Sequence, residues 1–374
     1  MLTIGFPRMH KEPGEVRDYF PDLMHGLAPG AKGIVIEEGS GSGIDKEPWQ
    51  YVEGHGNIHI GSNQDCYDQD IVVQVRSPED DELPRMKSGT ILFSMLHYST
   101  HPSRIRLISE LGFRPVSMDS VESDDGVRLI ENLRGTSWNA VWAGFRALKK
   151  TYPTFADKGR NPIEVVILGT GPVGRFAAEA ATKYGDVTLN KEYLSRGVPG
   201  VIVHLIGRNI TQDETALRAL LKRTDMLVDA TSRSDPTRHI IANHLVGILP
   251  KHAVVLDVTV DPYIADREPI QVKAVEGIPT GNLDQYEFPL DDPAFDLLPK
   301  GVSSAYRRMS VSCYSWPGIK PKECMDTYGS QMLGLLKILL DQPFEKLSLE
   351  SPDFLMRALY RGTLEYYQHQ QARG

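Results

Sequence analysis

Three closely spaced glycines follow a run of apolar residues in the middle of the chain. They are Gly169, Gly171 and Gly174, and a helix-forming stretch continues from them. Where a strand turns into a helix, the first glycine allows the tight turn, the second lets a pyrophosphate approach the backbone, and the third lets helix and strand pack closely. The N–H groups at the start of the helix then attract phosphate. The pattern predicts a dinucleotide site contacted by these glycines, Pro172 and Val173, with an ordinary strand–turn–helix as the alternative.

The choice of dinucleotide depends on the end of the next strand. An acidic residue there favours NAD, whereas a nearby arginine suits the 2′-phosphate of NADP. Residues 206–211 contain Arg208 and no acid. Arg208 could pair with a phosphate or simply occupy a surface loop, so the balance leans slightly to NADP and both cofactors stay open. Ser232, after the strand expected at 226–229, lies where nucleotide-binding folds contact the ribose, unless it is a plain loop residue.

The surrounding sequence predicts the elements that hold this motif. From 163 to about 280, short apolar runs alternate with helical stretches, as in a doubly wound parallel sheet. The first 135 residues alternate in the same way without a glycine fingerprint. We expect strands at 3–6, 33–37, 71–75, 90–93, 114–117, 164–168, 201–205, 226–229 and 254–258. We expect helices at 15–27, 46–53, 102–111, 136–150, 174–184, 213–223, 244–249, 327–340 and 352–370.

The expected fold class is therefore α/β, with two Rossmann-like domains, doubly wound parallel sheets and a cleft between them. The tail is expected to fold back onto the N-terminal half, which makes that domain discontinuous. We assign residues 1–135 and 305–374 to a substrate (catalytic) domain, and residues 136–304 to a dinucleotide-binding domain. Residues 188–200 read as an insertion between the first helix and second strand of the latter.

Composition argues against several other classes of protein. The chain has 374 residues and a formal net charge of −8, whereas a general nucleic-acid surface needs clustered Lys and Arg. It lacks an apolar run of about 18 residues, so no membrane span is expected, and the start does not resemble a signal peptide. The three cysteines are scattered without metal-ligand spacing, so we expect no metal site and a cytoplasmic protein with reduced thiols.

Further segments line up in order along the chain. They are residues 11–17 (KEPGEVR), 73–78 (VQVRSP), 92–97 (LFSMLH), 254–261 (VVLDVTVD) and 317–321 (PGIKP). Together with the glycine motif, this set resembles the alanine dehydrogenase and pyridine nucleotide transhydrogenase family. It also resembles the related lysine-forming saccharopine dehydrogenases. The resemblance covers most of the chain, and it rests on the order of the segments more than on any single one.

The resemblance implies roles for individual residues. Arg17 matches an arginine on the substrate carboxylate, and Arg76 stands where the family has a substrate-contacting lysine. His97 matches the family's histidine, and Asp261 matches an aspartate near the nicotinamide ribose and the reacting centre. Because a guanidinium does not deprotonate in proteins, the arginine at 76 leaves His97 as the candidate base near neutral pH. Solvated surface charges and an edge histidine are the structural alternatives, and Asp257 is expected to make a structural hydrogen bond.

The resemblance implies an NAD(P)-dependent amino-acid dehydrogenase that transfers hydride between the Cα of an amino acid and nicotinamide. Residues 118–128 look closer to the saccharopine branch. A saccharopine- or opine-type dehydrogenase acting on a secondary amine is therefore an alternative, and a non-catalytic nucleotide-binding protein is another. The expected partner is a small amino acid or oxo acid, and we expect a homo-oligomer, since family enzymes are often dimers or hexamers. The substrate side chain and the direction of flux stay open.

Overall fold

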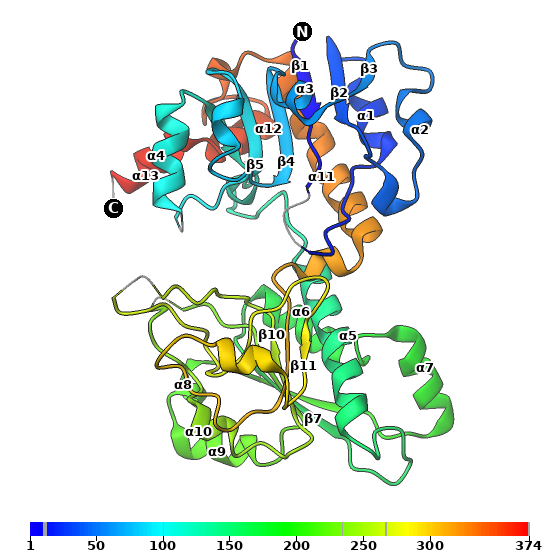
Figure 1. Ribbon diagram of the computed structural model, residues 1–374, viewed down its shortest axis with the longest axis vertical. Coiled ribbons are helices and arrows are strands. Elements are labelled where there is room, and N and C mark those ends of the chain that lie inside the picture. Colours follow the sequence, from blue (N-terminus) through cyan, green and yellow to red (C-terminus); the bar gives the residue numbers. More distant parts are fainter. Residues whose placement is uncertain (10–12, 100, 234, 266–267, 373–374) are drawn as a thin grey trace. The chain divides into compact units, whose positions relative to one another are not determined.

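The structure is a computed structural model that describes residues 1–9, 13–99, 101–233, 235–265 and 268–372. The chain divides into two compact units, each with one six-stranded sheet (Figure 1). Unit 1 comprises Met1–Lys11, Glu15–Asn132 and Lys320–Gly374, and unit 2 comprises Glu12–Gly14 and Leu133–Ile319. Lys11 and Glu12, which open the motif at 11–17, lie outside the described residues.

The sheet of unit 1 has the strand order β3-β2-β1-β4-β5-β6, and all neighbouring strands are parallel. The strands are β1 (Thr3–Phe6), β2 (Gly33–Glu37), β3 (Ile58–Gly61), β4 (Ile71–Arg76), β5 (Ile91–Met95) and β6 (Arg114–Ser117). This is the order of a doubly wound nucleotide-binding sheet, with the change of direction between β1 and β4. Loops after β1 and β4 therefore flank the crevice where such sheets bind ligands.

Most strands of unit 1 lie where their apolar runs predict them. A parallel sheet covered on both faces favours continuous apolar strands, and β4 is buried from Ile71 to Val75. The prediction missed β3, a short strand at the edge of the sheet whose His59 and Ile60 are exposed. Such a strand lacks the apolar run that marks the central ones.

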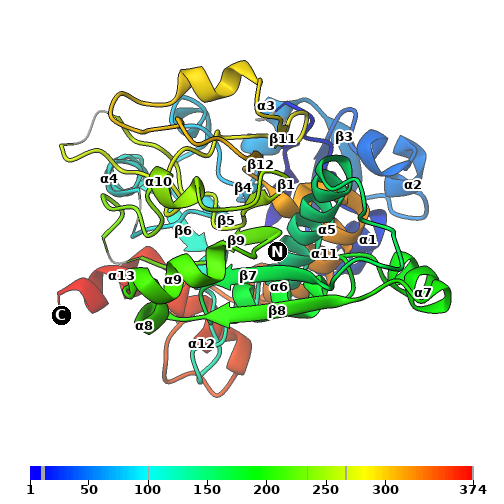
Figure 2. The ribbon, with the colours of Figure 1, turned by 90° about the horizontal axis from the view of Figure 1, so that it is seen from below.

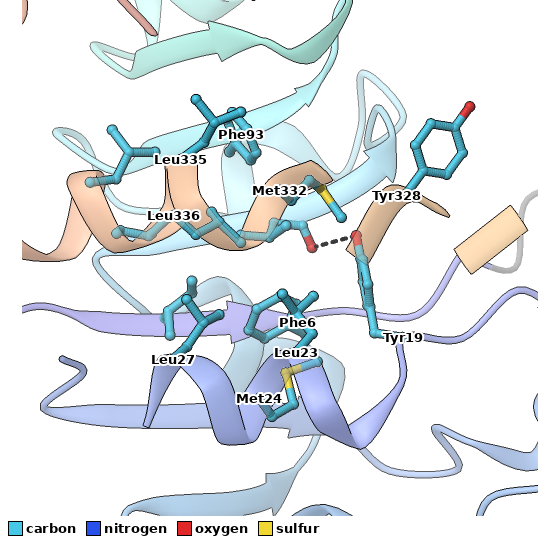
Figure 3. Close-up of a cluster of buried hydrophobic side chains, with 14 of the residues drawn as sticks. Phe6, Tyr19, Leu23, Met24, Leu27, Phe93, Tyr328, Met332, Leu335 and Leu336 are labelled. Carbon is cyan, nitrogen blue, oxygen red and sulfur yellow. Dashed lines mark hydrogen bonds between the residues drawn. The ribbon is translucent and has the colours of Figure 1, made fainter. Parts of the chain in front are cut away.

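Seven α-helices of the described part belong to unit 1. They are α1 (Pro21–Leu27), α2 (Pro48–Val52), α3 (Asn63–Tyr67), α4 (Pro102–Glu110), α11 (Pro321–Asp341), α12 (Phe354–Arg361) and α13 (Leu364–Gln371). Apolar side chains of α1 and α11 share one buried cluster with the sheet residues Phe6 and Phe93 (Figure 3). In the same cluster the Tyr19 hydroxyl donates a hydrogen bond to the Val73 carbonyl, at 3.4 Å. A helix from the last part of the chain, α11, thus packs against the sheet of unit 1.

Three helices differ most from their predicted extents, and the one expected at 327–340 already begins at Pro321. The helix expected at 15–27 begins at Pro21, because Phe20 is extended and proline occupies the first helical turn. The single helix expected at 352–370 is two helices, α12 and α13. The break falls before Thr363, whose side chain caps α13 by accepting a hydrogen bond from the Tyr366 amide.

The sheet of unit 2 has the order β11-β12-β10-β9-β7-β8. Its strands are β7 (Ile163–Leu168), β8 (Val201–Ile206), β9 (Met226–Asp229), β10 (Val254–Asp257), β11 (Glu287–Phe288) and β12 (Met309–Ser312). All neighbouring strands are parallel except the β11–β12 pair. β7 lies between β8 and β9 (Figure 2), so the strand order changes direction there. Both units are α/β and Rossmann-like, as predicted.

The helices of unit 2 are α5 (Leu133–Thr151), α6 (Pro172–Ala181), α7 (Val187–Arg196), α8 (Arg208–Thr211), α9 (Glu214–Leu221) and α10 (Asn243–Val246). α5 buries the apolar face predicted from its spacing, including Val141, Phe145 and Leu148. α7 covers most of the insertion expected at 188–200 and begins just before it, with Asp186 capping its first turn.

The return to unit 1 comes later than the sequence predicts. We expected residues from 305 onward to belong to the first domain, but β12 pairs in parallel with β10 in the sheet of unit 2. The chain therefore re-enters unit 1 at Lys320. The sequence does not indicate this strand, because its apolar residues alternate with serines within a proline-rich, loop-like stretch. The assignment of substrate and dinucleotide to the two units stays a prediction.

Candidate functional site

The glycine motif lies at the carboxyl end of β7, where the strand order of unit 2 changes direction. Gly169 has φ +107°, and a Cβ there would lie 2.3 Å from the Ala230 carbonyl oxygen. A Cβ on Gly174 would lie 2.0 Å from the Gly169 carbonyl oxygen. These two positions therefore require glycine, the first for its backbone angle and close approach, the second for the packing of α6 on the strand.

Gly171 has a different environment. A Cβ on this residue would meet no atom within 4 Å, and its φ of −69° is open to any residue. It is the N-cap of α6 without a side-chain cap, and Pro172 follows at the first helical position. The N–H groups of a first helical turn have no partner within the helix. Open space in front of such a turn suits the pyrophosphate of a dinucleotide, so the residues at this turn fit the expected cofactor.

The end of β8 holds the residues expected beside the adenosine ribose. Arg208 is the exposed first residue of α8, and its Nη2 donates to the Ser232 carbonyl at 3.4 Å. The structure thus brings together two predicted residues that are 24 positions apart. Asp213, the first acid after the strand, caps α9 by accepting hydrogen bonds from Thr215 and Ala216. The Asp213 carboxylate therefore already has hydrogen-bond partners in the first turn of α9.

A group of buried polar side chains lies at the carboxyl ends of three strands of the same sheet. Asp229 ends β9, Asp257 ends β10, and Ser312 ends β12 in register with it. Asp257 accepts hydrogen bonds from the Lys273 ammonium at 2.7 Å and the Ser312 hydroxyl at 3.0 Å. Burial works to raise the pKa of Asp257, but the charge and hydrogen bond of Lys273 lower it. The carboxyl is therefore held ionised.

Asp229 has the opposite shift. Burial and the negative charge of Asp257 raise the pKa of Asp229 to about 7, although hydrogen bonds from Thr231 oppose the rise. The unfolded chain releases this proton near the ordinary value of 3.8, while the folded protein keeps it to about 7. Folding stability should therefore fall as the pH rises through that interval.

Asn at position 229 should remove that part of the pH dependence. Because an amide does not ionise, Asp229→Asn should be more stable than the parent at about pH 8 by on the order of 1–3 kcal/mol. The difference should be smaller at about pH 5, where both forms are neutral in the folded state. Urea unfolding at the two pH values measures it. Parallel pH curves for the two proteins would show that Asp229 is not the group responsible.

Asp261 lies on the loop that follows β10. Its carboxylate is about one third exposed and pairs with Arg233, whose side chain is only 6% exposed. Arg233 also donates to the Val272 and Arg238 carbonyls. Val260, just before Asp261, has φ +58°, a strained angle for a β-branched residue. The predicted residue is thus held in one position by its neighbours.

In unit 1, Arg17 is not on a helix, contrary to the prediction. It lies in the segment before α1 with a side chain only 3% exposed, and it forms a two-point ion pair with Glu15. Burial opposes the charge, but the hydrogen bonds and charge of Glu15 raise the pKa of Arg17 above its ordinary value. Its remaining nitrogen, Nη1, lies 4.0 Å from the Cys324 sulfur. Glu15 therefore already neutralises much of this arginine.

Arg76 and His97 follow adjacent strands of the same sheet. Arg76 is the half-buried last residue of β4, just after an irregularity in its pairing with β5. His97 follows β5 and its side chain is 51% exposed. The order of β4 and β5 places Arg76 and His97 at the carboxyl ends of neighbouring strands, and Arg17 lies in the connection between β1 and α1. Carboxyl ends of parallel strands are where such sheets place functional side chains.

Asp119, which the sequence reasoning missed, orients His97. Its carboxylate lies 3.2 Å from His97 Nδ1 and accepts the His97 backbone N–H at 3.2 Å. The Ser117 hydroxyl donates to the same carboxylate at 2.6 Å. Burial works to raise the pKa of Asp119, but the bonds from His97 and Ser117 lower it to about 2. Since an ionised carboxylate can only accept, Nδ1 carries the proton and Nε2 is the ring nitrogen suited to act as a base.

Two kinds of feature are absent from the described part of the chain. It contains no group of three or more His, Cys, Asp and Glu side chains arranged to hold a metal ion. None of its helices is both long and apolar enough to cross a membrane.

Comparison with known proteins agrees with the resemblance drawn from the sequence. Residues 20–133 match the family model described as alanine dehydrogenase/PNT, N-terminal domain. An alanine dehydrogenase of Bilophila wadsworthia is 24% identical over 272 residues, 70% of this chain and 71% of that protein. Alanine dehydrogenase 2 of Staphylococcus aureus is 23% identical over 287 residues, 70% of this chain and 72% of the relative.

Two solved structures share the fold. A structure of L-alanine dehydrogenase superposes with a TM-score of 0.71 at 20% identity, covering 96% of this chain and 94% of its own. The transhydrogenase from Sinorhizobium meliloti gives a TM-score of 0.57 at 15% identity, covering 90% and 94%. The resemblance to the alanine dehydrogenase and transhydrogenase family is therefore confirmed, and so is the predicted fold class.

Proposed function

Since this chain is a relative of the alanine dehydrogenases and transhydrogenases, we propose that it is an NAD(P)-dependent amino-acid dehydrogenase. It would interconvert an amino acid with its oxo acid and ammonia. The observation that carries the proposal is the pairing of His97 with Asp119 at the carboxyl edge of a doubly wound sheet. An exposed imidazole whose Nδ1 is fixed by a buried carboxylate is a general base in a defined tautomer.

The remaining residues have roles that follow from their chemistry. Bound at the Gly171 turn, the nicotinamide cofactor would supply or accept the hydride. Arginine suits a substrate carboxylate because its planar fork binds it at two points, which fits Arg76. Arg17 could offer only Nη1, because Glu15 occupies its other side. Through Nε2, His97 would take the proton from the substrate nitrogen or from water. Asp261 would stabilise the positive charge that develops on the nitrogen.

An assay of cofactor oxidation tests this function. Purified protein would be given NADPH or NADH with a panel of oxo acids, first with ammonia and then with lysine or ornithine in its place. Turnover that needs ammonia supports the proposal, whereas turnover only with an amino acid as nitrogen donor supports the saccharopine- or opine-type alternative. Tight cofactor binding without turnover across the panel would favour the non-catalytic alternative. The homo-oligomer and the cytoplasmic location stay predictions.

The cofactor preference follows from the residues at the end of β8. We propose NADP over NAD, because Arg208 is exposed at the start of α8 and no acid is available there. Arg208→Asp should lower the ratio of NADP to NAD affinity by roughly tenfold to a hundredfold, since it replaces a charge-assisted hydrogen bond by repulsion. Fluorescence titration with the two reduced cofactors measures the ratio. Arg218→Asp is a matched charge reversal on α9, and an equal shift in that control would remove Arg208 from the explanation.

A further inference from the structure

Lys273 and Asp257 are buried charges for which the proposed reaction has no direct use. Both residues are 0% exposed, and their charged atoms lie 2.7 Å apart. Taking such a pair out of water is costly unless further hydrogen bonds satisfy it. Here the Ser312 hydroxyl donates to the same carboxylate oxygen, Oδ2, as Lys273 does.

The other oxygen of Asp257 supports the turn that follows β10. Oδ1 accepts the Val260 backbone N–H at 2.8 Å and the Thr259 hydroxyl at 3.1 Å. Val260 adopts the left-handed conformation, which a β-branched residue keeps only when its surroundings enforce it. The hydrogen bond to its amide is a direct way to enforce it.

The segment that carries Lys273 also supports the far side of the same turn. The carbonyl of Val272 accepts a hydrogen bond from Arg233 at 2.6 Å, and Arg233 in turn holds the Asp261 carboxylate. The Lys273 ammonium also lies 5.6 Å from the centre of the Tyr263 ring. Asp261 therefore lies between Val260 and Tyr263 in this turn. Val260 is held by Asp257, which pairs with Lys273, and the Tyr263 ring lies near the Lys273 ammonium.

We propose that the buried Asp257–Lys273 pair is a positioning device that fixes the turn 259–263 and so orients Asp261 toward its reaction partner. This role rests on the proposed function of Asp261. Asp257 and Lys273 act through the backbone amide of Val260 and touch neither substrate nor cofactor. The essential contact is the acceptor at Oδ1, and Lys273 balances the buried charge that a carboxylate brings to this position.

Two double variants separate this role from simple filling of the core. Asp257→Asn with Lys273→Met removes both charges but keeps an oxygen able to accept from Val260. Asp257→Leu with Lys273→Met also removes both charges but leaves no acceptor. Folding is checked by circular dichroism and thermal unfolding, and titration with NADPH checks the cofactor site. Hydrogen exchange of peptides covering residues 258–263 follows the turn without any need for activity.

The Asn/Met variant should keep exchange and kcat within about threefold of the parent. The Leu/Met variant should fold, yet exchange about tenfold faster in this turn and lose about 10–100-fold in kcat with little change in KM. Asp225→Asn is the matched control. Asp225 accepts the Glu164 backbone amide at 2.8 Å at the opposite, amino end of the sheet, so kcat should stay within about threefold.

Equal exchange and equal kcat in the two double variants would overturn the proposal. If the Leu/Met variant does not fold, Arg233→Met is the second test of the proposal. It removes the ion pair that holds the Asp261 carboxylate. Unchanged exchange and unchanged kcat in that variant would also overturn the proposal. If the parent shows no turnover with any amino acid, the proposed function fails, but the exchange measurements still show whether Asp257 fixes the turn.

Discussion

Replacing His97 is expected to lower kcat by roughly 10²–10⁴-fold, the usual loss when a general base is removed. The affinity for the cofactor should change little, because the expected phosphate contacts come from the glycine turn and not from the imidazole. His97 has φ +47°, a conformation that Asn also tolerates. His97→Asn is therefore a better first variant than His97→Ala, which adds backbone strain to the loss of the imidazole. Steady-state kinetics over a range of pH measures the effect.

The neighbouring His101 provides the control. It lies four residues on, directly before α4, and its Nδ1 lies 3.4 Å from the His97 carbonyl oxygen. His101→Ala should keep kcat within about threefold of the parent. Full activity of His97→Asn on the true substrate would remove His97 from the mechanism. An equal loss in both variants would indicate a general disturbance of this loop.

Gly171→Val is expected to weaken cofactor binding by roughly a hundredfold or more, the equivalent of two charge-assisted hydrogen bonds. The fold should survive, because a Cβ at this position meets no atom within 4 Å and the backbone angle is ordinary. The new side chain would instead occupy the space through which a pyrophosphate reaches the first turn of α6. Titration of intrinsic fluorescence with NADPH and NADH measures the loss.

Gly174→Ala should have the opposite pattern. The added Cβ would lie 2.0 Å from a backbone oxygen, so the helix or the strand must move and thermal stability should fall. Comparison of the two variants separates damage to the ligand site from damage to the fold. Cofactor binding that survives Gly171→Val at full strength would place the dinucleotide elsewhere.

The periodic elements of this fold could be predicted because local patterns determine them. The strands Thr3–Phe6, Gly33–Glu37 and Met226–Asp229 have the predicted ends, since each contains a short apolar run bounded by turn residues. β3 and β12 could not be predicted in this way. Polar residues interrupt the apolar pattern in both, and pairing with β2 or β10 makes them strands. The position of the domain boundary depended on β12, so the two errors share one cause.

The candidate site also has a part that the sequence predicts and a part that it does not. The glycine turn has a sequence signature because each glycine answers a local steric demand. The partners of the polar residues lie far away in sequence, so no spacing reveals them. Asp119 is 22 residues from His97, and Arg233 is 28 residues from Asp261. Glu15 is an exception, since a carboxylate two residues before Arg17 could have indicated that the arginine is already paired.

The discontinuous course of the chain has a consequence for its synthesis. Unit 1 begins first, but its sheet is covered by α11, whose buried Met332 and Leu336 belong to the final segment that starts at Lys320. Unit 2 is complete in sequence at Ile319, before that helix has left the ribosome. The half that is translated first therefore matures last, and the apolar residues that α11 later covers are the nascent surface that a chaperone would meet.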